Sequence, residues 1–314
     1  MPVDLSVRVG TLELPNPIVA ASGTFGHGDE VARRCDPTRL GAVTAKSQAP
    51  FAWPGNPPPR LQPIGAGLVN SVGLQGPGIE HWVEHELPAL RSHGARVIAS
   101  LWGHRVEDFA AAAAALRPVT GELVAVEVNV SCPNLAEHGR PFAHDAAETG
   151  AAVQAVAGVG LGLPVLAKLA PDVADLPAIA GAALAAGADG LTLVNTARAL
   201  LVDAEVGRPV LGAGTGGLSG APLKPIALRA VHEVATAHVG VPIIGTGGVN
   251  TGVDAVELLL AGAAAVGVGT ATFLDPRATL RILDELETWC ARHGVARVAD
   301  LTGALRAPDR EETA

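Results

Sequence analysis

The sequence predicts an α/β protein, a single (β/α)8 (TIM) barrel with loop insertions on its C-terminal face. Short runs that are apolar throughout alternate with alanine-rich helical runs along the 314 residues. Strands without a polar face, separated by helices, are typical of a parallel sheet that is buried on both sides. Eight such units in this length favour one closed barrel over an open sheet.

The elements follow one another in strand–helix order. The expected strands are 16–22, 41–47, 96–101, 123–130, 164–170, 190–195, 241–247 and 264–270. The expected helices are about 28–35, 78–92, 105–117, 144–157, 173–187, 222–238, 252–262 and 271–292. The stretch DFAAAAAALRP is helical by propensity and stops at Pro118. We expect one domain over 1–314, with a frayed tail at about 305–314.

Two longer insertions, 48–77 and 196–221, each follow an expected strand. Both should therefore lie on the C-terminal face, where barrel active sites form. The alternative architecture is a doubly wound open sheet, which needs a dinucleotide-binding turn after its first strand. A G-x-G-x-x-G does occur at Gly212, Gly214 and Gly217, but it comes late and runs into LSGAP instead of a helix. We interpret it as a coincidence of a glycine-rich loop.

Composition excludes several classes of protein. The net charge is −9 without a basic cluster, which argues against nucleic acid as a partner. The chain has only three cysteines, which does not indicate a disulfide-stabilised protein. Three thiolates also cannot supply the four ligands of an ordinary iron–sulfur cluster. The N-terminus lacks a signal-peptide pattern, and the uncharged run 149–167 is interrupted by glycines and a proline. We expect a cytoplasmic protein without a membrane span, and no residue grouping has metal-ligand spacing.

Glycine-containing turns in the last two strand–helix units indicate a phosphate site. Gly247 and Gly248 follow the seventh expected strand, and Gly269 and Thr270 follow the eighth. In barrels, the loops in these positions often bind phosphate through backbone N–H groups. The alternative is that the glycines only permit tight turns.

Lysine is scarce, occurring only at Lys46, Lys168 and Lys224. Lys46 ends the second expected strand and Lys168 lies in the fifth. A lysine in an apolar strand is costly unless its amine reaches a ligand or a partner, so both are candidate site residues. The alternative for each is a salt bridge across the top of the barrel. Lys224 stands beside a proline at a helix start, and we expect it to be solvated.

Four asparagines, Asn70, Asn129, Asn134 and Asn195, lie at strand ends or in the following loops. An amide both donates and accepts, so several together suit a ligand with amide-like edges. The alternative is turn formation, which fits Asn16 and Asn250 well. Cys132 stands within this set and is a candidate general base, since its surroundings can tune a thiol. Cys35 and Cys290 are expected to be inert and buried.

At these residues the chain resembles a known family. The segments ASGTFGHG, TAKSQ, GNPPPRL, VNSVGLQGPG, VNVSCPN, AKLAPD, LVNTA, GGLSGAPLKP, GTGGVNTG and VGVGT occur in the order seen in class 1 dihydroorotate dehydrogenases. The resemblance runs from about residue 5 to 290. NSVGLQGPG with GNPPPR resembles the class 1B catalytic subunit more than the fumarate-using class 1A enzyme. The class 2 membrane enzymes carry serine where this chain has Cys132.

The resemblance implies FMN-dependent oxidation of (S)-dihydroorotate to orotate in pyrimidine biosynthesis. Cys132 would be the base, and hydride would pass to the flavin. The implied substrate-binding residues are Lys46, Asn70, Ser71, Val72, Gly73, Leu74, Asn129, Asn134, Asn195 and Thr196. The implied FMN-binding residues are Ser22, Lys46, Ser47, Ser100, Asn129, Lys168, Val194, Gly220, Gly247, Gly248, Gly269 and Thr270. Ser100 stands where the family usually has asparagine, and Gly76 replaces another common asparagine.

Class 1B enzymes pass electrons to NAD+ through a second subunit that carries FAD and a 2Fe–2S cluster. The resemblance therefore implies such a partner, and our hypothesis is a homodimer of this chain docked to two such partners. Three alternatives remain at this point. The first is the related flavin barrel of dihydropyrimidine dehydrogenases, which has His in place of Asn134. The second is a non-redox sugar-phosphate barrel with Lys168 as a Schiff base. The third is a flavin-binding subunit without turnover.

Overall fold

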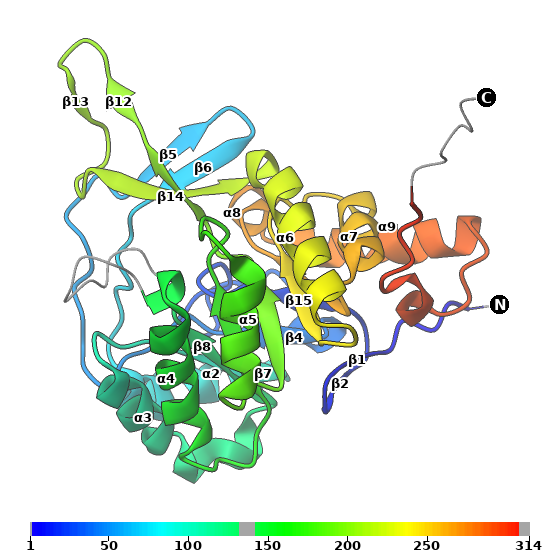
Figure 1. Cartoon of the computed structure of the whole chain (residues 1–314), viewed down its shortest axis with the longest axis horizontal. Coiled ribbons are helices and arrows are strands. Elements are labelled where there is room, and N and C mark those ends of the chain that lie inside the picture. The colour runs from blue at the N-terminus through cyan, green and yellow to red at the C-terminus, as the bar shows by residue number, and fades with distance from the viewer. Residues whose placement is uncertain (1, 132–141, 308–314) are drawn as a thin grey trace.

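Eight parallel strands close into a barrel in the computed structural model, which describes residues 2–131 and 142–307 (Figure 1). Around the barrel the strands run in the order β3, β4, β7, β8, β9, β10, β15 and β16, with β16 pairing back to β3. Their bounds are β3 (Ile18–Ala20), β4 (Ala42–Thr44), β7 (Val97–Leu101), β8 (Ala125–Asn129), β9 (Val165–Leu169), β10 (Gly190–Leu193), β15 (Ile243–Thr246) and β16 (Ala265–Val268). Each expected strand contains one of them, so the predicted barrel is confirmed.

The barrel strands are buried on both faces, which explains their apolar composition. Every residue of β7, β8 and β9 is buried, including Glu127 and Lys168, whose charges stand among apolar neighbours. The observed strands are shorter than expected at their ends. Asn16, for instance, forms a turn instead: its side chain accepts from the Ile18 N–H at 3.1 Å and donates to the Arg39 carbonyl at 2.6 Å.

Helices cover the outside of the barrel. Their bounds are α1 (Ile79–His81), the π-helical η2 (Trp82–Glu86), α2 (Leu87–Ser92), α3 (Val106–Ala115), α4 (Ala146–Ala157), α5 (Leu176–Ala185), α6 (Lys224–Ala237), α7 (Gly252–Ala261), α8 (Ala271–Leu274) and α9 (Ala278–Arg292). Short 3-10 turns are η1 (Pro37–Arg39), η3 (Arg117–Glu122), η4 (Phe142–His144), η5 (Ala221–Leu223) and η6 (Val298–Leu301). The expected helix 271–292 is divided at Pro276 into α8 and α9.

The helix expected at 28–35 was a wrong prediction. This segment is a series of turns. The Glu30 carboxylate accepts from the His27 and Gly28 N–H groups at 3.1 and 2.8 Å, which holds the start of the segment in a loop. Asp36 and Pro37 then begin η1, which leaves too few residues for a helix to propagate. Helix α9, from the other end of the chain, packs near β3.

Additional strands lie at both ends of the barrel. The hairpin β1 (Val7–Val9) and β2 (Leu12–Leu14) has its Gly10 turn against the Asp189 carbonyl and Pro242, which precede β10 and β15. It therefore lies at the N-terminal end of the strands. This hairpin was not predicted from the sequence.

The two insertions meet each other at the opposite end. Strands β5 (Leu61–Ile64) and β6 (Gly67–Asn70) from the first pair with β11 (Ala197–Leu200) and β14 (Thr215–Gly220) from the second. The result is a four-stranded antiparallel sheet in the order β11–β14–β6–β5, with a small hairpin of β12 (Val202–Asp203) and β13 (Arg208–Pro209) beside it (Figure 1). The sheet covers the C-terminal end of the barrel.

Candidate active site

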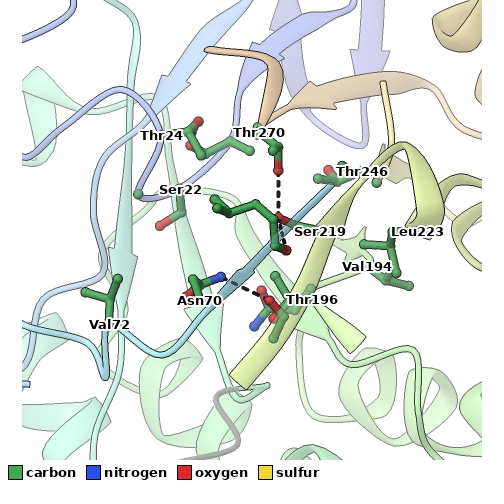
Figure 2. A pocket seen from close by; sticks show the side chains of 18 of the residues that line it. Ser22, Thr24, Asn70, Val72, Val194, Thr196, Ser219, Leu223, Thr246 and Thr270 are labelled. Atoms are coloured by element: carbon green, nitrogen blue, oxygen red, sulfur yellow. Dashed lines mark hydrogen bonds between the residues drawn. The ribbon is translucent and has the colours of Figure 1, made fainter. Parts of the chain in front are cut away.

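A cavity lies between the C-terminal ends of the barrel strands and the four-stranded sheet (Figure 2). The space between its lining residues, including the part open to solvent, is about 1220 Å³. Every barrel strand except β7 contributes a residue to its wall, either from its end or from the loop that follows. The insertions supply the roof through β5, β6, β14 and residues 71–74.

Most residues predicted for the site lie on this wall. They are Ser22, Lys46, Ser47, Asn70, Ser71, Val72, Gly73, Leu74, Asn129, Lys168, Val194, Asn195, Thr196, Gly220, Gly247, Gly248, Gly269 and Thr270. Cys132 and Asn134 lie outside the described residues. Ser100 is not on the wall: it is buried behind Ser47, and its hydroxyl lies 2.9 Å from the Ser47 hydroxyl. Ser100 can therefore influence a ligand only indirectly, through Ser47 or through Glu127.

The turn after β15 brings two backbones together. Gly247 and Gly248 have φ values of +136° and +75°. A Cβ built on Gly248 would lie 2.7 Å from the Lys224 backbone nitrogen, so only glycine fits there. The Thr246 hydroxyl, just before this turn, is buried and has no hydrogen-bond partner among the described residues. A glycine cradle beside an unpaired hydroxyl fits the predicted phosphate site.

The second predicted phosphate turn is also on the wall. Thr270 precedes α8, and its hydroxyl donates to the Ser219 hydroxyl of β14 at 2.8 Å (Figure 2). This bond ties the turn after β16 to the roof.

The two candidate lysines approach the cavity from different sides. Lys46 follows β4, and its Nζ would lie 3.2 Å from a Cβ built on Gly23, so this glycine leaves room for the amine. Lys168 in β9 is 5% exposed, and its Nζ lies 4.0 Å from the Glu127 Oε1. The predicted salt-bridge alternative is thus present for Lys168, together with its position on the cavity wall.

The asparagines are anchored by hydrogen bonds. Asn70 donates to the Gly217 carbonyl at 3.3 Å, Asn129 donates to the Ser47 hydroxyl at 3.0 Å, and Asn195 donates to the Ser131 hydroxyl at 2.9 Å. Ser131 directly precedes Cys132 in the chain. Fixed amides of this kind can hold a polar ring without first losing rotamer entropy.

Sequence reasoning missed part of the wall. The additional lining residues are Ala21, Gly23, Thr24, Leu61, Leu68, Gly216, Gly217, Ser219, Leu223, Thr246, Val249 and Phe273. Several adjoin predicted residues, and proximity in the chain was their only signal. Gly217 belongs to the G-x-G-x-x-G segment, whose last three residues begin the strand β14 instead of a helix. A Cβ on it would lie 2.0 Å from the Thr196 hydroxyl oxygen, so close packing explains this glycine.

The remaining candidate groups are structural. Burial raises the pKa of the Cys35 and Cys290 thiols, which agrees with their expected inertness. Lys224 was wrongly expected to be solvated: its Nζ contacts Asp254 and Glu257 at 2.7 Å each. The hydrogen bond that Lys224 donates to Asp254 and its ion pair with Glu257 raise the Lys224 pKa. Burial opposes ionisation of Asp254, but hydrogen bonds from Lys224, Asn250 and Thr251 hold its pKa below the ordinary value.

Residues 2–131 and 142–307 contain neither a metal-binding cluster nor a membrane-spanning helix. No cluster of three or more His, Cys, Asp or Glu side chains in these ranges is arranged to hold a metal ion. None of their helices combines the length and apolar character needed to cross a bilayer.

Comparison with known proteins identifies the family. A family model described as dihydroorotate dehydrogenase matches residues 4–289. The chain belongs to the dihydroorotate dehydrogenase family. It is therefore an oxidoreductase of this family, and the non-redox sugar-phosphate interpretation is not supported. Family membership also implies a flavin cofactor in general terms.

Individual relatives refine this dihydroorotate dehydrogenase assignment. The chain is 40% identical to the dihydroorotate dehydrogenase B (NAD(+)) catalytic subunit of Alkaliphilus metalliredigens, over 96% of this chain and 99% of the relative. It is 43% identical to the subunit of the same name from Geobacter sulfurreducens, over 96% and 98%. The predicted resemblance to the class 1B catalytic subunit is confirmed. A putative dihydroorotate dehydrogenase A (fumarate) from Solibacter usitatus is 44% identical, over 98% and 100%, so identity alone does not select the electron acceptor.

Proposed function

We propose that the chain oxidises (S)-dihydroorotate to orotate with one bound FMN, and that it passes the electrons to NAD+ through a partner subunit. The observation that carries this proposal is the composition of the cavity wall. It combines two lysines, three anchored asparagines and a glycine cradle in one space. Orotate offers a carboxylate and a cyclic imide, which suit cationic and amide side chains.

The residues present fit FMN. The Thr246 and Ser71 hydroxyls are buried on the wall without a hydrogen-bond partner among the described residues. Unpaired buried hydroxyls are costly, so their presence supports a polar ligand that completes them. Gly247, Gly248, Gly269 and Thr270 would hold the phosphate. Ser22, Lys46, Ser47, Asn129, Lys168, Val194 and Gly220 would contact the rest of the cofactor.

The reaction divides between cofactor and protein. Bound FMN supplies a two-electron acceptor for the hydride from C6 of the substrate. Cys132 takes the proton from C5, a role that rests on the family resemblance and on the position of Ser131 beside Asn129 and Asn195. The Lys168 ammonium stabilises the negative charge that reduction brings to the cofactor side of the cavity. Lys46, Asn70, Ser71, Asn195 and Thr196 hold the substrate, with Val72, Gly73, Leu74 and Asn134 around it.

The partner follows from the chain's own composition. Its three cysteines are fewer than the four thiolates of an ordinary 2Fe–2S cluster, which supports placing that cluster and FAD on a second subunit that transfers the electrons to NAD+. The name of the Alkaliphilus relative, a catalytic subunit of an NAD(+) form, supports this arrangement. We further propose a homodimer of this chain within the complex.

The test is reduction of the purified protein by substrate. We expect the visible flavin absorbance to bleach when dihydroorotate is added without oxygen. A Cys132→Ala variant should keep its FMN and lose most of this bleaching near neutral pH. An unbleached wild-type protein would refute the reaction, and an unchanged rate in Cys132→Ala would remove Cys132 as the base. Trials of NAD+ with the partner, fumarate and quinone then identify the acceptor.

A further inference from the structure

Glu127 is a buried carboxylate that the reaction described above does not use. It lies in the middle of β8 and is 2% exposed. It is not on the cavity wall, but Lys168 is, and the Lys168 Nζ lies 4.0 Å from the Glu127 Oε1. A carboxylate so deeply buried needs an opposite charge nearby, and Lys168 provides it. The pair therefore places a negative charge directly behind the cation that faces the ligand.

Both oxygens of Glu127 also accept hydrogen bonds. The Ser100 hydroxyl donates to Oε1 at 3.1 Å, and the Thr192 hydroxyl donates to Oε2 at 2.9 Å. An ionised carboxylate only accepts, and each hydroxyl has a single proton to give. The Ser100 hydroxyl therefore donates its only hydrogen to Glu127 and can only accept a hydrogen bond from any other neighbour.

This constraint fixes the direction of the next bonds. The Ser47 hydroxyl lies 2.9 Å from that of Ser100, so Ser47 must be the donor between them. Ser47 then accepts from the Asn129 amide nitrogen at 3.0 Å. The Asn129 carbonyl oxygen accepts from the Ser131 hydroxyl at 2.9 Å, and Ser131 accepts from the Asn195 amide nitrogen at 2.9 Å. Every donor in the chain points toward Glu127.

The ordered chain decides what the wall offers to a ligand. The Asn129 amide donates one N–H to Ser47 and its oxygen accepts from the Ser131 N–H and hydroxyl, so its second N–H is what it can offer to the cavity. Asn195 donates to both the Ser131 hydroxyl and carbonyl, so it presents its own carbonyl oxygen. The Ser22 hydroxyl donates to the Ala45 carbonyl at 2.9 Å and lies 3.3 Å from the Ser47 hydroxyl, whose proton goes to Ser100, so Ser22 offers a ligand an acceptor. A substrate with alternating donors and acceptors needs such a fixed pattern.

We propose that Glu127 is a positioning residue that orders this hydrogen-bond chain and balances the Lys168 charge behind the flavin. The inference rests on the proposed FMN-dependent reaction. Its first consequence is that the cavity wall presents a fixed arrangement of hydrogen-bond donors and acceptors that matches orotate. Its second consequence is a lower flavin reduction potential than Lys168 alone would produce, because the nearby anion opposes the added negative charge of reduced flavin.

Three variants separate these consequences. Glu127→Gln removes the charge and introduces a donor that can reverse the chain. Glu127→Asp keeps the charge. Ser100→Ala breaks the chain and leaves the charge in place. For each variant we would measure FMN content, the flavin midpoint potential by anaerobic dye titration, and the orotate dissociation constant from the shift of the oxidised flavin spectrum.

We expect Glu127→Gln to favour reduced flavin by about tenfold, equivalent to ~30 mV for a two-electron couple, and to bind orotate at least tenfold more weakly. Glu127→Asp should keep the wild-type potential. Ser100→Ala should keep the potential and weaken orotate binding about fivefold. Wild-type potential and orotate affinity in FMN-loaded Glu127→Gln would overturn the proposal. If Glu127→Gln does not retain FMN, unchanged orotate affinity in Ser100→Ala overturns the ordering. Failure of the proposed reaction is distinct, because the wild-type protein itself would then not bleach with dihydroorotate.

Discussion

The close backbone approach at Gly248 predicts a large effect of a single methyl group. In Gly248→Ala the new Cβ would lie 2.5 Å from the Lys224 Cβ and 2.7 Å from its backbone nitrogen. The residue would also keep a φ of +75°, which L-residues adopt at a cost of about 1–2 kcal/mol. Relieving the overlap costs a further ~1–3 kcal/mol. We therefore expect the free energy of unfolding to fall by about 2–5 kcal/mol.

Gly160→Ala is the matched control. Gly160 has a similar φ of +67°, is exposed in the loop before β9, and a Cβ there would meet nothing within 4 Å. Its cost should be only about 1 kcal/mol, because strain is partly offset by a less flexible unfolded chain. Thermal unfolding of the two apoproteins compares these costs, at about 2 °C per kcal/mol for a chain of this size.

The same two variants test the cofactor cradle. Moving the turn after β15 away from Lys224 displaces the backbone N–H groups proposed for the FMN phosphate. We expect the FMN dissociation constant of Gly248→Ala to rise at least tenfold, or about 1.4 kcal/mol, while Gly160→Ala binds FMN like the wild type. If Gly248→Ala has the same melting temperature as Gly160→Ala and binds FMN with wild-type affinity, the backbones at Gly248 and Lys224 are not in close contact and the reasoning is wrong.

Two further predictions concern the same end of the barrel. Thr246→Val removes a buried hydroxyl that has no hydrogen-bond partner among the described residues. The free energy of unfolding should therefore be unchanged or raised by about 1 kcal/mol, whereas the FMN dissociation constant should rise about tenfold. An unchanged FMN affinity would show that this hydroxyl does not contact the ligand. Asp254→Asn weakens the cap of α7, where Asp254 accepts from the Thr251 N–H at 2.8 Å, and should cost about 1–2 kcal/mol at pH 7. Because the folded pKa of Asp254 lies below 3.8, this cost should shrink as the pH falls below 3.8. Urea unfolding of the wild type and of Asp254→Asn at pH 7 and pH 3 measures this difference in the free energy of unfolding. An equal difference at the two pH values would exclude stabilisation by the ionised Asp254 carboxylate.

The barrel could be predicted because its signal is local. Each strand is a short apolar run, and every strand except the first is followed by a helical run before the next barrel strand begins. The segment 28–35 misled because its composition permits a helix, while the Glu30 hydrogen bonds that hold it in turns are not visible in a propensity. The roof could not be predicted, since the pairing of Asn70 with Gly217 joins residues 147 positions apart and leaves no periodic trace.

The candidate site also has a part that the sequence predicts and a part that it does not. Strand ends and glycine pairs predicted most of the wall, and the family resemblance supplied the roles. The direction of the hydrogen bonds from Asn195 to Glu127 could not be read from residue types, because serine hydroxyls both donate and accept. Lys224 was misjudged because its partner Asp254 comes 30 residues later in the chain, where no local pattern reports the contact.

The four-stranded sheet over the cavity also limits how this enzyme can be altered. Its inner strands, β6 and β14, come from separate insertions and hold each other through paired backbones from Gly67 opposite Gly220 to Asn70 opposite Gly217. Gly216 and Gly217 admit no side chain against Asn70 and Thr196. The two insertions therefore have to vary together. A chimera that exchanges one of them with a relative should lose the roof, while one that exchanges both should transfer the relative's substrate preference onto an unchanged barrel.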